Sequence, residues 1–128
     1  MSKRIIHTQA APAAVGPYSQ AVTAPAGQLV FLSGQIGLVP ETGVMVSEDF
    51  ETQVRQAFAN MQAVIEAAGG RLENIVKLTL FLTDLKQFHI VNSIMAELIP
   101  EPFPARSTVG VSSLPKDAQF EIEATIVI

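Results

Sequence analysis

Hydrophobic and polar positions along the chain predict one long helix near its middle. From Phe50 to Ala68 apolar residues recur every three or four positions, which is the spacing of an amphipathic helix. Ser47 precedes this stretch as the expected N-cap, followed by two acidic residues in the first turn, where the helix dipole favours negative charge. Gly69 and Gly70 are expected to end the helix.

A second, shorter helix is predicted after Asp84. Asp84 and Gln87 have the spacing of a capping box, in which two side chains satisfy free backbone groups at the helix start. Three closely spaced prolines after position 99 end the pattern. The predicted apolar stripe consists of Phe88, Val91, Met95 and Leu98.

Strands are predicted where apolar residues alternate with polar ones or form short runs between turns. The candidate ranges are 3–7, 18–22, 29–33 with its continuation 35–38, 75–83, 105–111 and 119–128. The order of elements predicts an α+β sandwich in which two helices cover one face of one sheet. The other face mixes apolar and polar residues, among them Phe81, Val127 and Lys77, and such faces are often oligomer interfaces.

Composition describes one ordinary domain, expected to span residues 1–128. Cysteine is absent, which excludes thiolate catalysis and disulfides, and His7 and His89 are too isolated to suggest a metal site. The net charge is -4 and the basic residues are scattered, so no nucleic-acid partner is expected. No signal peptide or membrane span is recognisable, which favours a cytoplasmic protein without a membrane partner.

Two charged residues are the main candidates for chemistry. Arg106 follows a proline-rich turn in PFPARST, where its guanidinium could bind a carboxylate through two parallel hydrogen bonds. Glu121 lies between apolar neighbours, a setting that suits a general acid or a water activator. Glu123 shares its face and competes for this role. Taken singly, each of them is more often a surface or ion-paired residue than a functional one.

Several further motifs become specific only in combination. APAAVGPYSQAV, FLSGQIGLVPETG, EAAGG followed by NIVKLTLFLTDLKQFHIVN, PFPARSTV and LPKDAQFEIEA occur in this order between about Ile5 and Ile126. Together they resemble the RidA/YjgF family of imine deaminases. PARS followed by LPKD and EIEA is the closest to a family signature.

The resemblance implies a fold, an assembly and a reaction. The fold would be the chorismate mutase-like α+β sandwich, with one mixed β-sheet covered on one face by two helices. Three chains would form a homotrimer with active sites between subunits. The reaction would be hydrolysis of enamines and imines such as 2-aminoacrylate, 2-iminopropanoate and 2-iminobutanoate to a 2-keto acid and ammonia, with no metal or cofactor.

The resemblance also assigns roles to individual residues. Arg106 matches the arginine that binds the substrate carboxylate, and Glu121 matches the acid that positions and activates water. The matching pocket residues are Tyr18, Ser33, Gly34, Asn92 and Thr108.

Three departures from the family pattern affect this picture. Thr108 stands where the deaminase branch often has cysteine, so a thiol role is lost while a backbone contact would survive. The segment 93–103 is short and proline-rich and is expected to edge the pocket. Phe120 is bulkier than the aliphatic residue expected before the catalytic glutamate.

Other functions remain open at this point. A non-catalytic protein that binds a keto acid or an amino acid would use Arg106 in the same way, but it would not need Glu121. A ribonuclease or translation inhibitor is disfavoured by the acidic charge. Chorismate mutase activity would require several cations in the pocket, and Arg106 alone has a pocket-like context.

Overall fold

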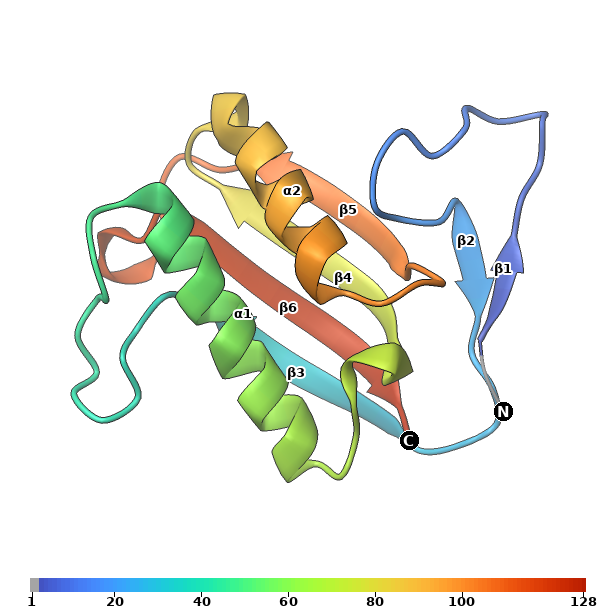
Figure 1. Ribbon diagram of the computed structural model, residues 1–128, viewed down its shortest axis with the longest axis horizontal. Helices are drawn as coiled ribbons and strands as arrows, with labels where there is room; N and C mark the ends of the chain where they lie inside the picture. Colours follow the sequence, from blue (N-terminus) through green and yellow to red (C-terminus); the bar gives the residue numbers. More distant parts are fainter. Residues whose placement is uncertain (1–2) are drawn as a thin grey trace.

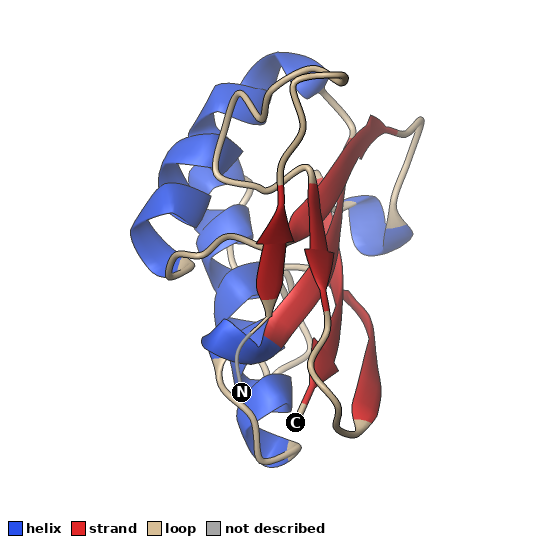
Figure 2. Cartoon of the chain, turned by 90° about the vertical axis from the view of Figure 1, so that its right-hand side faces the viewer, coloured by secondary structure: helices blue, strands red, loops and turns tan. Residues whose placement is uncertain are grey.

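The computed structural model describes residues 3–128 as a mixed four-stranded sheet with two helices on one face and a separate two-stranded ribbon (Figure 1). Figure 2 shows the sheet edge-on, with both helices on the same side of it. The long elements are β3 (Leu29–Gln35), α1 (Phe50–Ala67), β4 (Ile75–Leu82), α2 (Phe88–Leu98), β5 (Ala105–Gly110) and β6 (Phe120–Val127). The predicted α+β sandwich is therefore confirmed.

The order of strands in the sheet is β3-β6-β4-β5, with β4 and β5 parallel and the other pairs antiparallel. Parallel neighbours need a crossover connection, and α2 supplies it between β4 and β5. The alternation along β6 is realised as predicted, because Phe120, Ile122, Ala124 and Ile126 are buried against the helices.

The helix α1 buries the stripe that its spacing predicts. Val54, Phe58, Met61 and Ile65 are buried, and α1 packs on β6 and β3. Removing one such side chain to the β-carbon typically costs about 2–5 kcal/mol of stability, because a cavity remains. The predicted N-cap is two residues off: Asp49 caps α1 by accepting from Thr52 N at 3.0 Å. The Ser47 hydroxyl instead accepts from Asp49 N.

The start of the second helix also differs from the prediction. Asp84 caps a 3-10 turn, Leu85–Gln87, by accepting from Lys86 N at 3.0 Å, and α2 begins only at Phe88. No capping box with Gln87 forms, because the side chain of Asp84 accepts from the N–H of Lys86 and not from that of Gln87. In the stripe of α2, Ile94 is buried in place of Leu98, which lines a groove toward α1 instead.

The first two strands do not join the main sheet. β1 (Arg4–Ile6) and β2 (Ala21–Thr23) pair only with each other as an antiparallel ribbon, so the prediction of one sheet was wrong for them. All three residues of β1 are exposed, including the large hydrophobic side chains of Ile5 and Ile6. Tyr18 was predicted in a strand but lies in the loop between β1 and β2.

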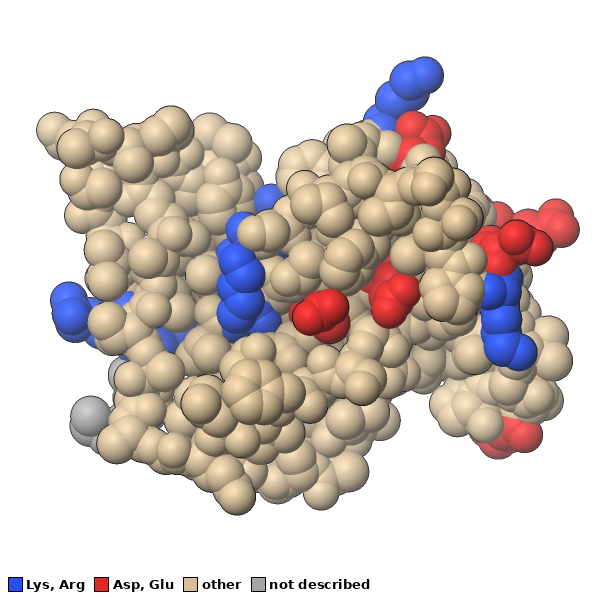
Figure 3. Space-filling view, turned by 180° about the vertical axis from the view of Figure 1, so that it is seen from behind, with Lys and Arg blue, Asp and Glu red and all other residues tan. Residues whose placement is uncertain are grey.

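A register shift changes which side chains of β4 face the helices. Ile75, Leu78, Leu80 and Leu82 are buried, whereas Val76 is only partly buried because β4 is irregular between Ile75 and Lys77. The opposite face of the sheet is open, as Figure 3 shows from behind, with a few charged side chains among uncharged ones. On this face Phe31 is 74% exposed, which is unusual for a large aromatic side chain.

Candidate active site

Arg106 is placed by the parallel pairing of β5 with β4. It lies opposite Leu78, whose side chain is buried under the helices, so Arg106 projects toward the same side. Thr108 lies opposite Leu80 and shares this orientation. Arg106 and Thr108 therefore share one face of β5, as the alternation of side chains along a strand requires.

Side chains of α2 and of the β1–β2 loop hold the guanidinium of Arg106. Its Nη1 donates to Asn92 Oδ1 at 2.7 Å and to Met95 Sδ at 3.5 Å. The Arg106 Cζ lies 4.7 Å from the centre of the Tyr18 ring and 5.1 Å from that of Phe88. Two aromatic contacts and a charge-assisted hydrogen bond fix the plane of the guanidinium before any ligand arrives.

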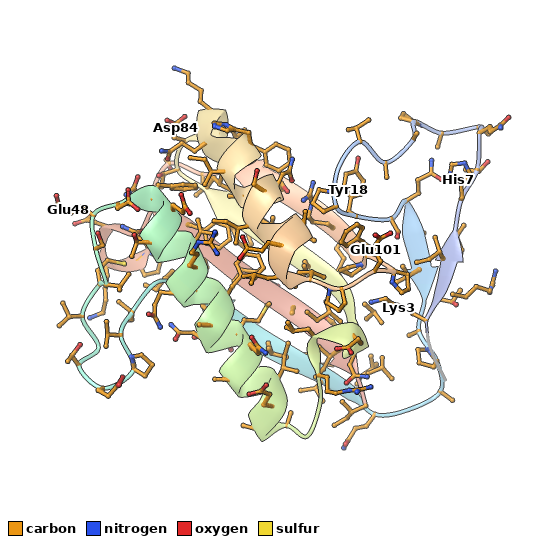
Figure 4. All side chains as sticks on the ribbon, viewed as in Figure 1. Lys3, His7, Tyr18, Glu48, Asp84 and Glu101 are labelled. Carbon is orange, nitrogen blue, oxygen red and sulfur yellow. The ribbon has the colours of Figure 1, made fainter. Side chains whose placement is uncertain are left out.

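The loop that carries Tyr18 is itself held in place. Tyr18 N donates to Gly16 O at 2.8 Å, and the Tyr18 hydroxyl accepts from Val15 N at 3.3 Å. Ser19 ties the loop to the start of β5 through Ser19 N to Pro104 O at 3.0 Å. Figure 4 shows Tyr18 on this loop, beside the edge of the sheet that β5 forms.

A cavity of about 220 Å³ opens in front of Arg106. Its lining residues are Val15, Tyr18, Phe88, Arg106 and Thr108. The Thr108 hydroxyl oxygen is buried and has no hydrogen-bond partner within residues 3–128. A buried hydroxyl without a partner is costly, so this atom is a candidate to bond a ligand or a neighbouring chain.

The electrostatics of the cavity favour an anion. Burial lowers the pKa of the Arg106 guanidinium from its ordinary value, and the Tyr18 hydroxyl opposes this shift. An arginine remains protonated in proteins, so the pocket holds a cation. Neither ion pair found in residues 3–128 involves Arg106, because both are formed by Arg55. A carboxylate in the cavity would meet a desolvated, oriented guanidinium.

Glu121, Gly34 and Ser33 form a second group on the other side of the sheet. Glu121 lies opposite Phe81 in the antiparallel pairing of β6 with β4, and both alternate away from the buried side. Its carboxylate lies directly over Gly34, where a β-carbon would overlap Oε2. β3 is irregular between Leu32 and Gln35, which brings this glycine under the carboxylate.

The structure thus divides the predicted site residues into two groups. Arg106, Tyr18, Asn92 and Thr108 meet at the cavity beside α2. Ser33, Gly34 and Glu121 lie together on the open face. Glu123 is exposed on that face, opposite Thr79, and the three atoms nearest to a β-carbon at Gly34 all belong to Glu121.

Three pocket residues were not assigned a site role from the sequence. Phe88 and Met95 contact Arg106, and Val15 lines the cavity. Phe88 lies four positions before Asn92, one helical turn away, so the placement of Asn92 in the pocket already implied a neighbour there.

The structure shows where two of the three departures from the family pattern lie. Phe120 is fully buried between Phe50 and Phe58 of α1, so its bulk fills the core and not the pocket. Met95 from the segment 93–103 accepts from Arg106 Nη1, and none of the residues of this segment lines the cavity in front of Arg106.

Within residues 3–128, no group of three or more histidine, cysteine or acidic residues is arranged to hold a metal ion. None of the helices in this range combines the length and the apolar character needed to cross a bilayer.

Comparison with known proteins gives a consistent result. The family model described as Endoribonuclease L-PSP matches residues 8–128. A 2-iminobutanoate/2-iminopropanoate deaminase from Dermatophagoides farinae is 48% identical over 98% of this chain and 97% of its own length. The crystal structure of RidA from an Antarctic Psychrobacter is 45% identical, with a TM-score of 0.77 over 98% of this chain and 99% of its own.

A further solved structure carries a small ligand. Escherichia coli TdcF with bound serine is 41% identical, with a TM-score of 0.75 over 98% of both chains. The family model and these relatives each extend over nearly the whole sequence. This chain therefore belongs to the RidA/YjgF family, whose model bears the description Endoribonuclease L-PSP.

Proposed function

We propose that this protein hydrolyses reactive 2-imino acids and their enamine tautomers, of the 2-iminopropanoate and 2-iminobutanoate type, to 2-keto acids and ammonia. The observation that carries the proposal is the oriented guanidinium of Arg106 at a cavity sized for a small carboxylate. The deaminase name of a relative 48% identical over nearly its whole length supports the same reaction.

In this proposal Arg106 binds the substrate carboxylate through the guanidinium nitrogens that Asn92 does not use. Glu121 orders a water molecule and accepts its proton as the oxygen adds to the imine carbon. Glu121 passes this proton to the nitrogen, which gives a neutral carbinolamine. The hydroxyl proton of the carbinolamine then moves through Glu121 to the nitrogen, the C–N bond breaks, and ammonia leaves as the C=O bond of the 2-keto acid forms. An imine carbon is already electrophilic, so orientation and proton transfer suffice, and no metal or cofactor is required.

We further propose that the active site is completed between chains of a homotrimer. Arg106 and Glu121 of one chain project from opposite faces of the sheet, so one chain alone does not present both to the same substrate. The exposed Phe31, 74% accessible on the edge strand β3, and Val109 on the opposite edge strand β5 supply apolar surface on the open face for such an assembly. The mass of the purified protein in dilute solution tests this proposal, and the mass of a single chain would contradict it.

The activity is tested by a coupled assay with a pyridoxal-dependent serine or threonine dehydratase. The protein should accelerate clearance of the released imine, and Arg106→Ala and Glu121→Ala should each abolish most of this acceleration. Arg55→Ala is a control, because Arg55 is exposed on α1 outside the proposed site. Glu123→Ala separates the two acids of the open face, because Glu123 is the alternative candidate for the role of Glu121, and this variant should keep the activity. No acceleration by the unmodified protein would contradict the proposed reaction.

A binding function without catalysis is the second candidate. The serine bound in the related TdcF structure shows that a family member takes up a small carboxylate. If the present protein only binds, Glu121→Ala should leave its affinity for 2-oxobutanoate unchanged, and neither the unmodified protein nor this variant should accelerate imine clearance. Nucleic acid is not the proposed ligand, because the net charge is -4. The cytoplasmic location stays a prediction.

A further inference from the structure

One buried polar side chain of α1 lies outside the proposed site but is bonded to the segment that carries Glu121. Gln53 is only 2% exposed, and both ends of its amide are used. Its Nε2 donates to Ser47 O at 2.9 Å, and its Oε1 accepts from Gln119 N at 2.9 Å. A buried amide is costly unless it is bonded in this way, so its place in an apolar helix face calls for a reason.

Gln53 joins three segments that are distant in sequence. Ser47 belongs to the loop before α1, and Gln119 immediately precedes β6. The backbone of Gly37, just after β3, packs so closely on Gln53 that a β-carbon at Gly37 would lie 2.9 Å from Gln53 O. The ends of β3 and β6 that lie near Gly34 and Glu121 are therefore held against the same residue.

The backbone between Gln53 and Glu121 leaves little freedom. The Gln119 carbonyl accepts from Thr83 N at 3.1 Å while its N–H is held by Gln53. The next side chain, Phe120, stacks on Phe58 at a ring-centre distance of 6.1 Å. Because successive side chains of a strand point to opposite faces, fixing Phe120 in the core directs Glu121 onto the open face.

The turn before Gln119 has an unusual backbone. Lys116 and Asp117 both have φ of 55°, in the left-handed region that residues with side chains seldom adopt. A cavity of about 530 Å³ borders this turn, lined in part by Gln53, Lys116 and Gln119. Gln119 itself is held by three hydrogen bonds: its N–H donates to Gln53, its Nε2 donates to Glu48 O at 2.7 Å, and its carbonyl accepts from Thr83 N. The bond to Gln53 is the one that ties its backbone to the buried face of α1.

We propose that Gln53 is a positioning residue for Glu121, which it holds over Gly34 through the backbone of Gln119. The inference rests on the proposed hydrolytic function, since it assigns Gln53 to the step in which Glu121 acts on water. It also predicts different effects on turnover and on substrate binding. Gln53 contacts neither Arg106 nor its partners, so loss of Gln53 should impair turnover and spare carboxylate binding.

The test compares Gln53→Met with Asn60→Leu in the intact protein. Methionine keeps the length of the side chain but cannot bond Gln119 or Ser47. Asn60 is a matched control because it lies on the same helix and donates to Ile36 O and Leu38 O, but it has no bond to β6. Three quantities are measured: the maximal rate of imine hydrolysis, the Kd for 2-oxobutanoate, and hydrogen exchange at residues 119–121.

Gln53→Met should lower the maximal rate by about 10- to 100-fold, the scale on which a misplaced catalytic group affects turnover. Its Kd for 2-oxobutanoate should stay within about twofold of the unmodified protein, and exchange at 119–121 should accelerate. Asn60→Leu should leave all three quantities nearly unchanged. An unchanged rate in folded Gln53→Met, an equal loss in Asn60→Leu, or a parallel loss of 2-oxobutanoate binding would overturn the inference.

A second variant and the exchange measurement cover two cases in which the comparison above is not sufficient. If Gln53→Met does not fold, Gln53→Asn retains the amide but withdraws it by one methylene, and it should give a smaller rate loss; a rate equal to that of the unmodified protein would overturn the role. If the unmodified protein binds 2-oxobutanoate but does not hydrolyse the imine, the proposed function fails. The exchange measurement then still decides whether Gln53 holds the start of β6.

Discussion

Arg106 and Glu121 lie on opposite faces of one sheet, Arg106 beside α2 and Glu121 on the open face. The separation follows from strand register: Arg106 pairs with the buried Leu78, and Glu121 pairs with Phe81. In the proposed homotrimer, a substrate held by Arg106 would meet Glu121 of another chain. Changes around Arg106 should therefore weaken binding of the carboxylate, whereas changes around Glu121 should lower the rate of hydrolysis.

Asn92 orients the guanidinium, and its removal should weaken binding of the carboxylate. In Asn92→Ala the bond to Arg106 Nη1 is lost, and charge-assisted bonds of this kind contribute enough to raise the Kd for 2-oxobutanoate about 10-fold or more. Titration calorimetry checks this value. Ser93→Ala is the control, since Ser93 is exposed one position along α2. Equal affinities for Asn92→Ala and Ser93→Ala would contradict the role.

Gly34 leaves room for the Glu121 carboxylate, so a single methyl group should displace it. Gly34→Ala puts a β-carbon where Glu121 Oε2 lies, and the maximal rate should fall about 100-fold with little change in 2-oxobutanoate affinity. Gly43→Asn serves as the control because Gly43 has φ of 69° with open space around it, and asparagine tolerates that conformation. Full activity of Gly34→Ala would refute this placement of the acid.

Thr108 should show opposite effects on folding and on function. Its hydroxyl is buried without a partner in residues 3–128, so Thr108→Val should raise the free energy of unfolding by about 1 kcal/mol. If the hydroxyl bonds the substrate, the same variant should raise KM about 10-fold. Urea denaturation and the coupled assay measure the two effects. A variant that is both less stable and fully active would exclude this interpretation.

Lys3 should make the free energy of unfolding change with pH in the alkaline range. Its ammonium donates to Ile75 O at 2.8 Å and to Glu73 O at 3.3 Å. Burial lowers the pKa of Lys3 from its ordinary value of 10.5, and the charge of Glu73 opposes the shift. Between the lowered pKa and 10.5 the unfolded chain binds the proton more readily than the folded chain, so stability rises with pH in this interval.

The contribution of Lys3 is isolated by comparison with Lys3→Met, which keeps the stem without the charge. The difference in the free energy of unfolding, unmodified protein minus Lys3→Met, should increase as the pH rises toward 10.5. Urea titrations at a series of pH values measure it. A difference that is flat or that falls with pH would show that the ammonium is not buried as described.

The local pattern of apolar and polar residues was sufficient to predict most of the helices and strands. The stripe of α1 and the alternation of β6 identified their buried faces because burial repeats with the geometry of a helix or a strand. Helix starts were less predictable: Asp49 and not Ser47 caps α1, since several polar residues compete for the same free N–H groups. The ribbon of β1 and β2 was misplaced because the strand pattern does not specify a partner.

For the site, the sequence by itself determined which residues belong to the family pattern, including Arg106 and Glu121. Only the tertiary structure decided where each of them points. Strand pairing sets the face of every side chain, and a shift of one residue would exchange the two faces. The partners Phe88 and Met95 reach Arg106 across the β4–α2–β5 crossover, a contact between residues whose pairing no local spacing encodes.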